Sequence, residues 1–377
     1  MEKYIYSRIL MEKIQPWLFQ GKVLIIYGPR QVGKTTLAKS ILDQHPDSLY
    51  LNCERPNVGE LLRSGNLERM RSYIGNVRLV VFDEAQKIPK IGEILKLLID
   101  TYPEIQYLAT GSSSFNLISE LSEPLTGRNV KFIMYPLALR ELSARYDAFQ
   151  IDEKVPELLR FGSYPDIVDR SDNEKIQLLE ELTSDYLFRD VLSIEKVRKS
   201  DLLVNMLKAI ALQVGHEVSF RELSGLLKIS VETVQKYIQL LEKSFVLFSL
   251  PSFSRNLRKE IGSSRKYYFY DLGIRNSLIN NFNPPEIRND TGQLWENFCL
   301  MDRIKRNQAL GRTVNYYFWR TYDQKEIDLL EESEGRLSAI EFKWKSQKIK
   351  PPSDFLNAYP GSLFQVVTRE NYRDFLM

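Results

Sequence analysis

The chain has 377 residues, of which 43% are hydrophobic and 27% charged, and this balance excludes a globally disordered protein. The 52 Lys and Arg against 49 Asp and Glu leave a net charge of +3, which excludes nucleic-acid binding driven by bulk charge. Two cysteines and two histidines are too few for a zinc ribbon or a disulfide scaffold, so a reduced, cytoplasmic protein is expected.

Five apolar, strand-like runs alternate with helical patterns in the first part of the chain. The runs are Val23–Tyr27, Leu49–Leu51, Leu79–Phe82, Ile105–Ala109 and Phe132–Tyr135. Continuous apolar strands separated by helices are typical of a parallel sheet that is covered on both faces. Residues 1–145 are therefore predicted to form an α/β domain.

A glycine-rich loop follows the first of these runs. Residues 28–35 read GPRQVGKT and match the pattern G-x-x-x-x-G-K-[ST], with a helical run behind them. In such a loop, backbone N–H groups and the helix N-terminus hold phosphates, Lys34 reaches the β- and γ-phosphates, and the Thr35 hydroxyl binds Mg²⁺. The predicted ATP-binding residues are Gly28, Pro29, Arg30, Gln31, Val32, Gly33, Lys34, Thr35 and Thr36.

Two other strand ends carry polar residues that suit ATP hydrolysis. The third run ends in Asp83, expected to hold Mg²⁺, and Glu84, expected to position the attacking water. The fourth run ends near Thr110 and Ser112, where a group that contacts the γ-phosphate is expected. A plain helix cap remains the alternative for these two residues.

The patterns GPRQVGKTTL, FDEAQ and TGSSS give residues 1 to about 145 a clear family likeness. This part resembles an AAA-type P-loop ATPase of the bacterial and archaeal branch. The resemblance implies that the fourth strand lies between the P-loop strand and the Asp83 strand. It also implies a role for Arg128 as an arginine finger, acting within the chain or from a neighbouring subunit. A surface salt bridge is the alternative for Arg128.

In the middle of the chain, helical patterns replace the alternation of strands and helices. Residues 146–199 have highly charged helical patterns and are expected to form a helical lid or connector. Residues 200–262 predict three helices, the last two capped by Ser219 and Ser230, followed by a β-ribbon. This order is the outline of a winged helix-turn-helix.

DNA contact by this segment is the first expectation. The third helix offers Glu232, Thr233, Gln235 and Lys236, of which Thr and Gln can reach base edges. A basic patch follows, with Arg255, Arg258, Lys259, Arg265, Lys266 and Arg275 against Glu260 and Asp271. A structural lid or a protein-docking module is the alternative, and Glu232 on the third helix favours it.

Residues 263–377 return to an α/β pattern. A helix over Trp295–Ile304 precedes strands over Val314–Trp319, Glu326–Leu330, Leu337–Lys343 and Leu363–Thr368. Four charged residues fall on these elements and make a candidate site for Mg²⁺ or Mn²⁺ with a charge stabiliser: Glu296, Asp328, Glu341 and Lys343. In this context the stretches WENF, YYFWR, EID and IEFK resemble the PD-(D/E)XK nuclease core, which implies a restriction-endonuclease-like fold.

The sequence thus predicts a Mg²⁺-dependent ATPase that acts on DNA, with ATP controlling the winged helix and the nuclease-like domain. The alternative is a nucleotide-operated switch that binds protein partners through a catalytically silent nuclease-like domain. No uncharged apolar run approaches the ~18 residues of a membrane span, so no membrane partner is expected. An oligomer is compatible with either hypothesis.

Overall fold

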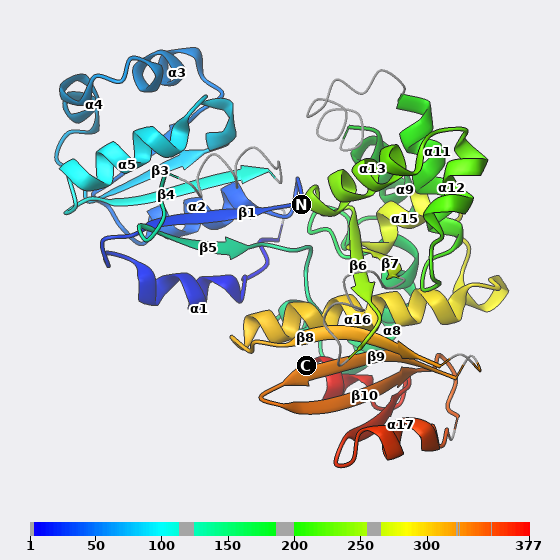
Figure 1. Ribbon diagram of the computed structural model, residues 1–377. Helices are drawn as coiled ribbons and strands as arrows, with labels where there is room; N and C mark the ends of the chain where they lie inside the picture. Colours follow the sequence, from blue (N-terminus) through cyan, green and yellow to red (C-terminus); the bar gives the residue numbers. More distant parts are fainter. Residues whose placement is uncertain are drawn as a thin grey trace.

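The computed structural model describes residues 4–112, 124–185, 200–254, 265–321, 323, 325–347 and 349–377. Its N-terminal part is a five-stranded parallel sheet flanked by helices (Figure 1). The elements of this part are α1 (Leu10–Ile14), β1 (Val23–Gly28), α2 (Lys34–Asp43), β2 (Ser48–Asn52), α3 (Pro56–Arg63), α4 (Leu67–Ile74), β3 (Leu79–Asp83), α5 (Ile91–Thr101), β4 (Gln106–Ser112) and β5 (Asn129–Ile133).

The strand order is β2-β3-β4-β1-β5, so β4 lies between β1 and β3 as predicted. Because all five strands run parallel, the residues that follow β1, β3 and β4 meet at one edge of the sheet. The buried strand residues alternate between two apolar cores. Val23 and Ile25 belong to the core under α3–α5, whereas Leu24 and Ile26 pack on the other face of the sheet.

A helical region connects this sheet to the rest of the chain. It comprises α7 (Leu139–Leu142), α8 (Ala148–Phe161), α9 (Asp172–Asp185), α11 (Ser200–Leu212), α12 (Phe220–Leu227), α13 (Val231–Lys243) and α15 (Leu272–Leu278). Ser219 and Ser230 cap α12 and α13 as expected, because their side chains accept the backbone N–H groups of Glu222 and Thr233. The antiparallel ribbon of β6 (Leu247–Pro251) and β7 (Arg265–Phe269) follows these helices.

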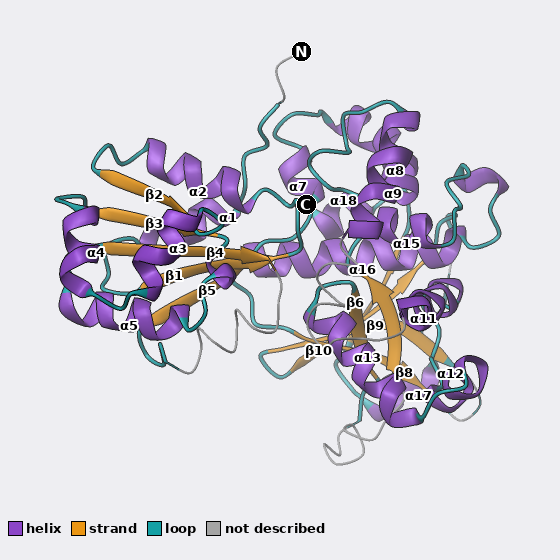
Figure 2. Ribbon diagram, turned by 90° about the horizontal axis from the view of Figure 1, so that it is seen from above, coloured by secondary structure: helices purple, strands orange, loops and turns teal. Residues whose placement is uncertain are grey.

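The C-terminal part is a four-stranded sheet with the order β11-β10-β9-β8. Its elements are α16 (Thr291–Ala309), β8 (Asn315–Arg320), β9 (Glu326–Ser333), β10 (Arg336–Phe342), α17 (Ser353–Ala358), β11 (Leu363–Val367) and α18 (Tyr372–Leu376). The long helix α16 runs across this sheet and reaches toward the N-terminal part (Figure 2). Its central position lets one helix contact both sheets.

One apolar cluster joins buried residues of all four predicted segments, for example Leu24, Leu159, Leu241 and Trp295. A second cluster lies wholly within the predicted segment 1–145. The ribbon spans the boundary predicted at residue 262, because β6 and β7 pair along their whole length. The four predicted segments thus share one core, and the first also has a core of its own.

Candidate functional site

The glycine-rich loop lies between β1 and α2, at the carboxyl edge of the sheet. Gly28 has no room for a side chain, because a Cβ there would lie 2.1 Å from the Met134 carbonyl oxygen. Gly33, with a φ of +99°, turns the chain into α2. Lys34 is buried, and its ammonium donates to the carbonyl oxygens of Gly28 and Pro29 at 3.0 and 2.6 Å. The loop thus encloses a positive charge where phosphates are expected.

Thr35 and Asp83 lie side by side at this edge. The Thr35 hydroxyl donates to Asp83 Oδ1 and Oδ2 at 3.0 and 2.9 Å. Tyr50, on β2, donates to the same carboxylate, and burial together with this hydrogen bond raises the pKa of Tyr50. A hydroxyl and a carboxylate are hard oxygen ligands that suit Mg²⁺ together with nucleotide phosphates, so these residues fit the expected metal.

Glu84 projects from a strained position directly after β3. Its φ of 53° is in the left-handed region, and its backbone N–H donates to Thr110 Oγ1 at 3.3 Å. Gln86 donates to the Glu84 carboxylate and, at 2.9 Å, to Ser112 Oγ. Ser112 is therefore linked to Glu84 through Gln86, and Thr110 also donates to Asp83.

Lys34, Thr35, Tyr50, Asp83 and Glu84 line one cavity of about 1080 Å³. Its floor is formed by the glycine-rich loop, with Lys34, Thr35, Asp83 and Glu84 among the lining residues. Its walls come from two other parts of the chain, namely the segment Tyr4–Arg8 before α1 and the pair Pro165–Asp166 between α8 and α9. The volume suits a nucleotide, and the connector between α8 and α9 would border it.

Arg128 lies away from this cavity. It precedes β5, and its carbonyl oxygen accepts from the N–H of Val23 at the start of β1, so it sits at the opposite edge of the sheet. Its guanidinium pairs with Asp100 Oδ1 at 2.6 Å. This exposed pair is the surface salt bridge given as the alternative for Arg128, and the position does not bring Arg128 to the cavity within the chain.

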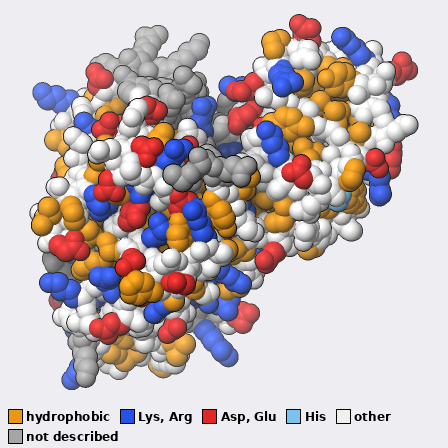
Figure 3. Space-filling view, turned by 180° about the vertical axis from the view of Figure 1, so that it is seen from behind, with side chains coloured by type: hydrophobic (Ala, Val, Ile, Leu, Met, Phe, Trp, Pro, Cys, Tyr) orange, Lys and Arg blue, Asp and Glu red, His pale blue; other side chains and the backbone are white. Residues whose placement is uncertain are grey.

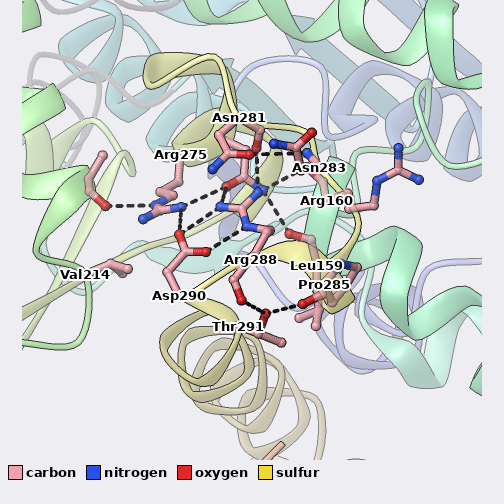
Figure 4. A network of polar contacts seen from close by, with 12 residues as sticks. Leu159, Arg160, Val214, Arg275, Asn281, Asn283, Pro285, Arg288, Asp290 and Thr291 are labelled. Atoms are coloured by element: carbon pink, nitrogen blue, oxygen red, sulfur yellow. Dashed lines mark hydrogen bonds and ion pairs between the residues drawn. The ribbon is translucent and has the colours of Figure 1, made fainter.

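Two cations of the expected basic patch lie inside the protein. Arg255, Arg258, Lys259 and Glu260 lie outside the described residues, but Lys266 and Arg275 are 1% and 2% exposed. Arg275 pairs with Asp290 Oδ2 at 2.6 Å and belongs to the network that holds the start of α16 (Figure 4). Two of the six cations are therefore internal. On the face shown in Figure 3, basic and acidic side chains are interspersed.

The third helix of the middle segment does expose polar residues. Glu232, Gln235 and Lys236 on α13 are exposed, whereas Thr233 is half-buried and its hydroxyl lies 3.1 Å from that of Ser230. Among these residues, the acid Glu232 accompanies the cation Lys236. Together, the four residues named for base contact therefore carry no net positive charge.

The carboxylates predicted for the C-terminal metal site lie close to two lysine ammonium groups. Lys343 Nζ lies 2.9 Å from Glu341 Oε2 and 3.7 Å from Asp328 Oδ2. Asp328 Oδ2 also accepts the Phe342 N–H at 2.8 Å. Glu296 Oε1 accepts the Tyr268 hydroxyl at 2.6 Å and lies 3.5 Å from Lys266 Nζ.

The structure brings the four expected residues together, with Lys343 beside Glu341 and Asp328 and with Glu296 near Asp328. Among the described residues, no group of three or more His, Cys, Asp or Glu is placed to hold a metal ion. Lys266, which was not expected here, also faces Glu296. A cationic residue that sequence reasoning assigned to a surface patch thus lies inside the cluster.

The electrostatics of the cluster reflect this crowding. Burial raises the pKa of Glu296 to about 8, Asp328 adds to the shift, and Lys266 opposes it. Burial and Asp328 likewise raise the pKa of Glu341 to about 7, against Lys343. Burial alone would lower the pKa of Lys266, but Glu296 and the neighbouring carboxylates raise it above its ordinary value.

Sequence reasoning did not identify Arg8 and Tyr50, which line the nucleotide cavity, or Gln86, which donates to Glu84 there. Gln86 lies two residues after Glu84 in the FDEAQ pattern, so the sequence could have suggested this contact. Tyr50 lies on the strand next to β3, and strand order alone could have placed it there. Arg8 carries no local signal, because the groups it contacts are 24 to 133 residues away along the chain.

Family models match three consecutive parts of the chain. Residues 20–143 match the AAA domain, and residues 152–285 and 291–373 match two domains of unknown function, DUF8612 and DUF4143. The last boundary falls just before α16, after the β6–β7 ribbon. The N-terminal part is thus similar to an AAA domain.

Relatives in two distant organisms align over most of the chain. An uncharacterized protein of Mycobacterium tuberculosis is 27% identical over 343 residues, covering 90% of this chain and 74% of the relative. An uncharacterized protein of Methanocaldococcus jannaschii is 26% identical over 348 residues, covering 86% and 75%. Among solved structures, the Walker-type ATPase of Pyrococcus abyssi has a TM-score of 0.52 at 16% identity, covering 73% of this chain and 96% of that one. This likeness shows a P-loop NTPase fold.

None of the helices among the described residues has the length and apolar character needed to cross a membrane.

Proposed function

We propose that the protein is a Mg²⁺-dependent ATP-hydrolysing switch. The observation that carries this proposal is the single cavity that holds Lys34, Thr35, Asp83 and Glu84 and is bordered by the connector at Pro165–Asp166. Lys34 would neutralise phosphate charge, and Thr35 and Asp83 would hold Mg²⁺. Because the connector lines the same cavity, the nucleotide would be in contact with the rest of the chain as well as with the loop.

Nucleotide binding needs only the loop and the metal ligands, whereas hydrolysis also needs a group that orients water, and Glu84 would supply it. Its carboxylate would orient the water that attacks the γ-phosphate, and Ser112 would restrain it through Gln86. Magnesium, when bound, would stabilise charge on the β- and γ-phosphate oxygens. Arg30, Gln31, Val32 and Thr36 complete the loop whose backbone N–H groups would hold those phosphates.

For the rest of the chain we propose a docking role toward a protein partner rather than DNA cleavage. The internal positions of Lys266 and Arg275 remove two cations from the expected DNA surface. The ammonium group of Lys266 faces Glu296, one of the carboxylates that a nuclease would offer to a metal. The winged-helix and nuclease-like segments would then serve as binding modules.

Hydrolysis measured with and without duplex DNA tests the proposal. We expect Mg²⁺-dependent phosphate release, lost in Lys34→Ala and reduced about 10²–10⁴-fold in Glu84→Gln. We expect no stimulation by DNA and no cleavage of plasmid DNA with Mg²⁺ or Mn²⁺. Stimulation by DNA that is lost in both variants would support the DNA-acting hypothesis instead. Absence of phosphate release from the wild type would refute the ATPase proposal.

A further inference from the structure

Arg8 joins the glycine-rich loop to the region beyond the N-terminal sheet. Its guanidinium donates to the Val32 carbonyl oxygen at 2.5 Å, to the Tyr135 carbonyl oxygen at 2.6 Å and to Glu141 Oε1 at 2.8 Å. The side chains of Arg8 and Glu141 are 8% and 6% exposed. One planar, buried guanidinium therefore fixes the loop, the chain after β5 and helix α7 together.

Glu141 extends this connection. Its Oε2 accepts the N–H of Ala138 at 3.0 Å, and its Oε1 accepts the N–H of Ile9 at 3.1 Å. The next N–H along the chain, that of Leu139, donates to Asp302 Oδ1 on α16 at 3.0 Å. Three consecutive contacts thus lead from the phosphate-binding loop to α16.

The same stretch is attached to α16 at two more points. Lys305 Nζ donates to the Leu137 carbonyl oxygen at 3.1 Å, and Gln308 donates to the Ile133 carbonyl oxygen at 3.1 Å. Asp302 and Lys305 are both buried. Asp302 Oδ1 holds the Leu139 N–H, and Lys305 Nζ also donates to Ser163 Oγ at 3.2 Å. A shift of α16 relative to this stretch would leave buried charged groups without these partners, and that is costly.

The other end of α16 belongs to the C-terminal cluster. Glu296 lies near Lys266 and bonds to Tyr268, two residues of β7 in the ribbon. Trp295 is fully buried and packs against Trp344 in the C-terminal part. A shift of α16 caused by the loop would therefore reach both the ribbon and the C-terminal sheet.

We propose that Arg8 is a positioning residue that couples the nucleotide state of the loop to helix α16. The inference rests on the proposed function, since it needs a nucleotide in the cavity. Phosphates that draw the loop backbone toward themselves would move the Val32 carbonyl, and the Arg8 fork would transmit this movement to Glu141 and then to Asp302. Arg8 itself contacts no phosphate in this scheme.

Hydrogen exchange of the full chain tests the coupling. Amide exchange of residues 291–309 is measured by mass spectrometry with no nucleotide, with Mg²⁺-ADP and with a Mg²⁺-bound non-hydrolysable ATP analogue. In the wild type we expect the analogue to slow exchange of α16 about threefold or more. In Arg8→Lys, which keeps the charge but not the planar fork, this effect should disappear even at an analogue concentration that calorimetry of this variant shows to be saturating.

Two further variants make the outcome interpretable. Glu141→Gln breaks the same network by an isosteric change and should also abolish the effect on α16, so the test survives if one variant fails to fold. Arg71→Lys is the matched control and should behave as the wild type. Arg71 lies on α4 and donates to the carbonyl oxygen of Gly75, which caps the end of that helix. A wild-type protein that binds the analogue without a change at α16, or an Arg8→Lys protein that keeps the full change, overturns the coupling. A wild type that binds neither nucleotide overturns the proposed function and the coupling with it.

Discussion

The Lys266 ammonium lies 3.5 Å from Glu296 Oε1, and this contact joins strand β7 to helix α16. Lys266 also pairs with Glu326 on β9, so a single cation contacts the helix and the C-terminal sheet. The lysine is 1% exposed. It therefore acts as an internal counter-charge for carboxylates and is not available to bind a DNA phosphate.

Removal of this charge should destabilise the protein strongly. We expect Lys266→Met to lower the free energy of unfolding by about 3–5 kcal/mol, because Glu296 and Glu326 would stay partly buried without their partner. Urea denaturation followed by tryptophan fluorescence measures the change. Lys345→Met, at an exposed lysine two residues beyond Lys343, is the matched control and should change stability by less than about 0.5 kcal/mol. If Lys266→Met has unchanged stability but binds DNA more weakly, Lys266 contributes to a DNA-binding surface and is not an internal counter-charge.

Stability should also depend on pH through Glu296 and Glu341. Their pKa values in the folded protein, about 8 and about 7, are raised from 4.5. The folded state therefore binds more protons than the unfolded state, and stability is lost as pH rises from about 5 to about 8. We expect the melting temperature to fall over this interval. In Glu296→Gln the fall should be smaller, whereas Glu334→Gln in the exposed β9–β10 turn should leave it unchanged.

Local patterns predict the parallel sheet of the N-terminal part and the glycine-rich loop at its edge, but not Arg8 or Tyr50, which line the same cavity. The strands around the loop are continuous apolar runs, and parallel pairing brings Thr35 and Asp83 together although 48 residues separate them. Arg128, expected as an arginine finger with a surface salt bridge as the alternative, precedes β5 and pairs with Asp100 at the opposite edge of the sheet. The first strand of the ribbon is predicted over Phe245–Leu250, but Phe245 has a φ of 56° and β6 begins at Leu247.

Burial of charged residues could not be predicted in the same way. Lys266 and Arg275 lie among other basic residues in the sequence, which favours an exposed patch. Their burial depends on partners from other elements, such as Glu326, 60 residues beyond Lys266, and Ala211, 64 residues before Arg275. Such pairs follow from how α16, the ribbon and the C-terminal sheet pack, and no local pattern encodes that packing.

Loss of the Asp83 carboxylate should weaken metal binding and metal-dependent hydrolysis. We expect Asp83→Asn to reduce Mg²⁺-dependent hydrolysis about 100-fold or more, since each ~1.4 kcal/mol of lost metal stabilisation costs tenfold in rate. A Mg²⁺ titration of the residual rate should need a higher concentration to saturate. Asp100→Asn, at the exposed partner of Arg128 on the far edge, controls for the loss of a carboxylate. A wild-type Mg²⁺ dependence in Asp83→Asn would exclude Asp83 from the metal site.

The tightest steric requirement of the phosphate-binding loop is at Gly28. We expect Gly28→Ala to lower the free energy of unfolding by about 2 kcal/mol or more, because its Cβ would lie 2.1 Å from the Met134 carbonyl oxygen and because its φ is +147°. Nucleotide affinity should fall with it, since relief of the clash moves the loop. Gly225→Ala is a matched control on α12, where a Cβ meets nothing within 4 Å, and should stabilise by about 0.5–1 kcal/mol. Denaturation and calorimetry of both variants check the pair, and a Gly28→Ala protein with wild-type stability and affinity would show that β1 and the chain after β5 approach less closely than the structure indicates.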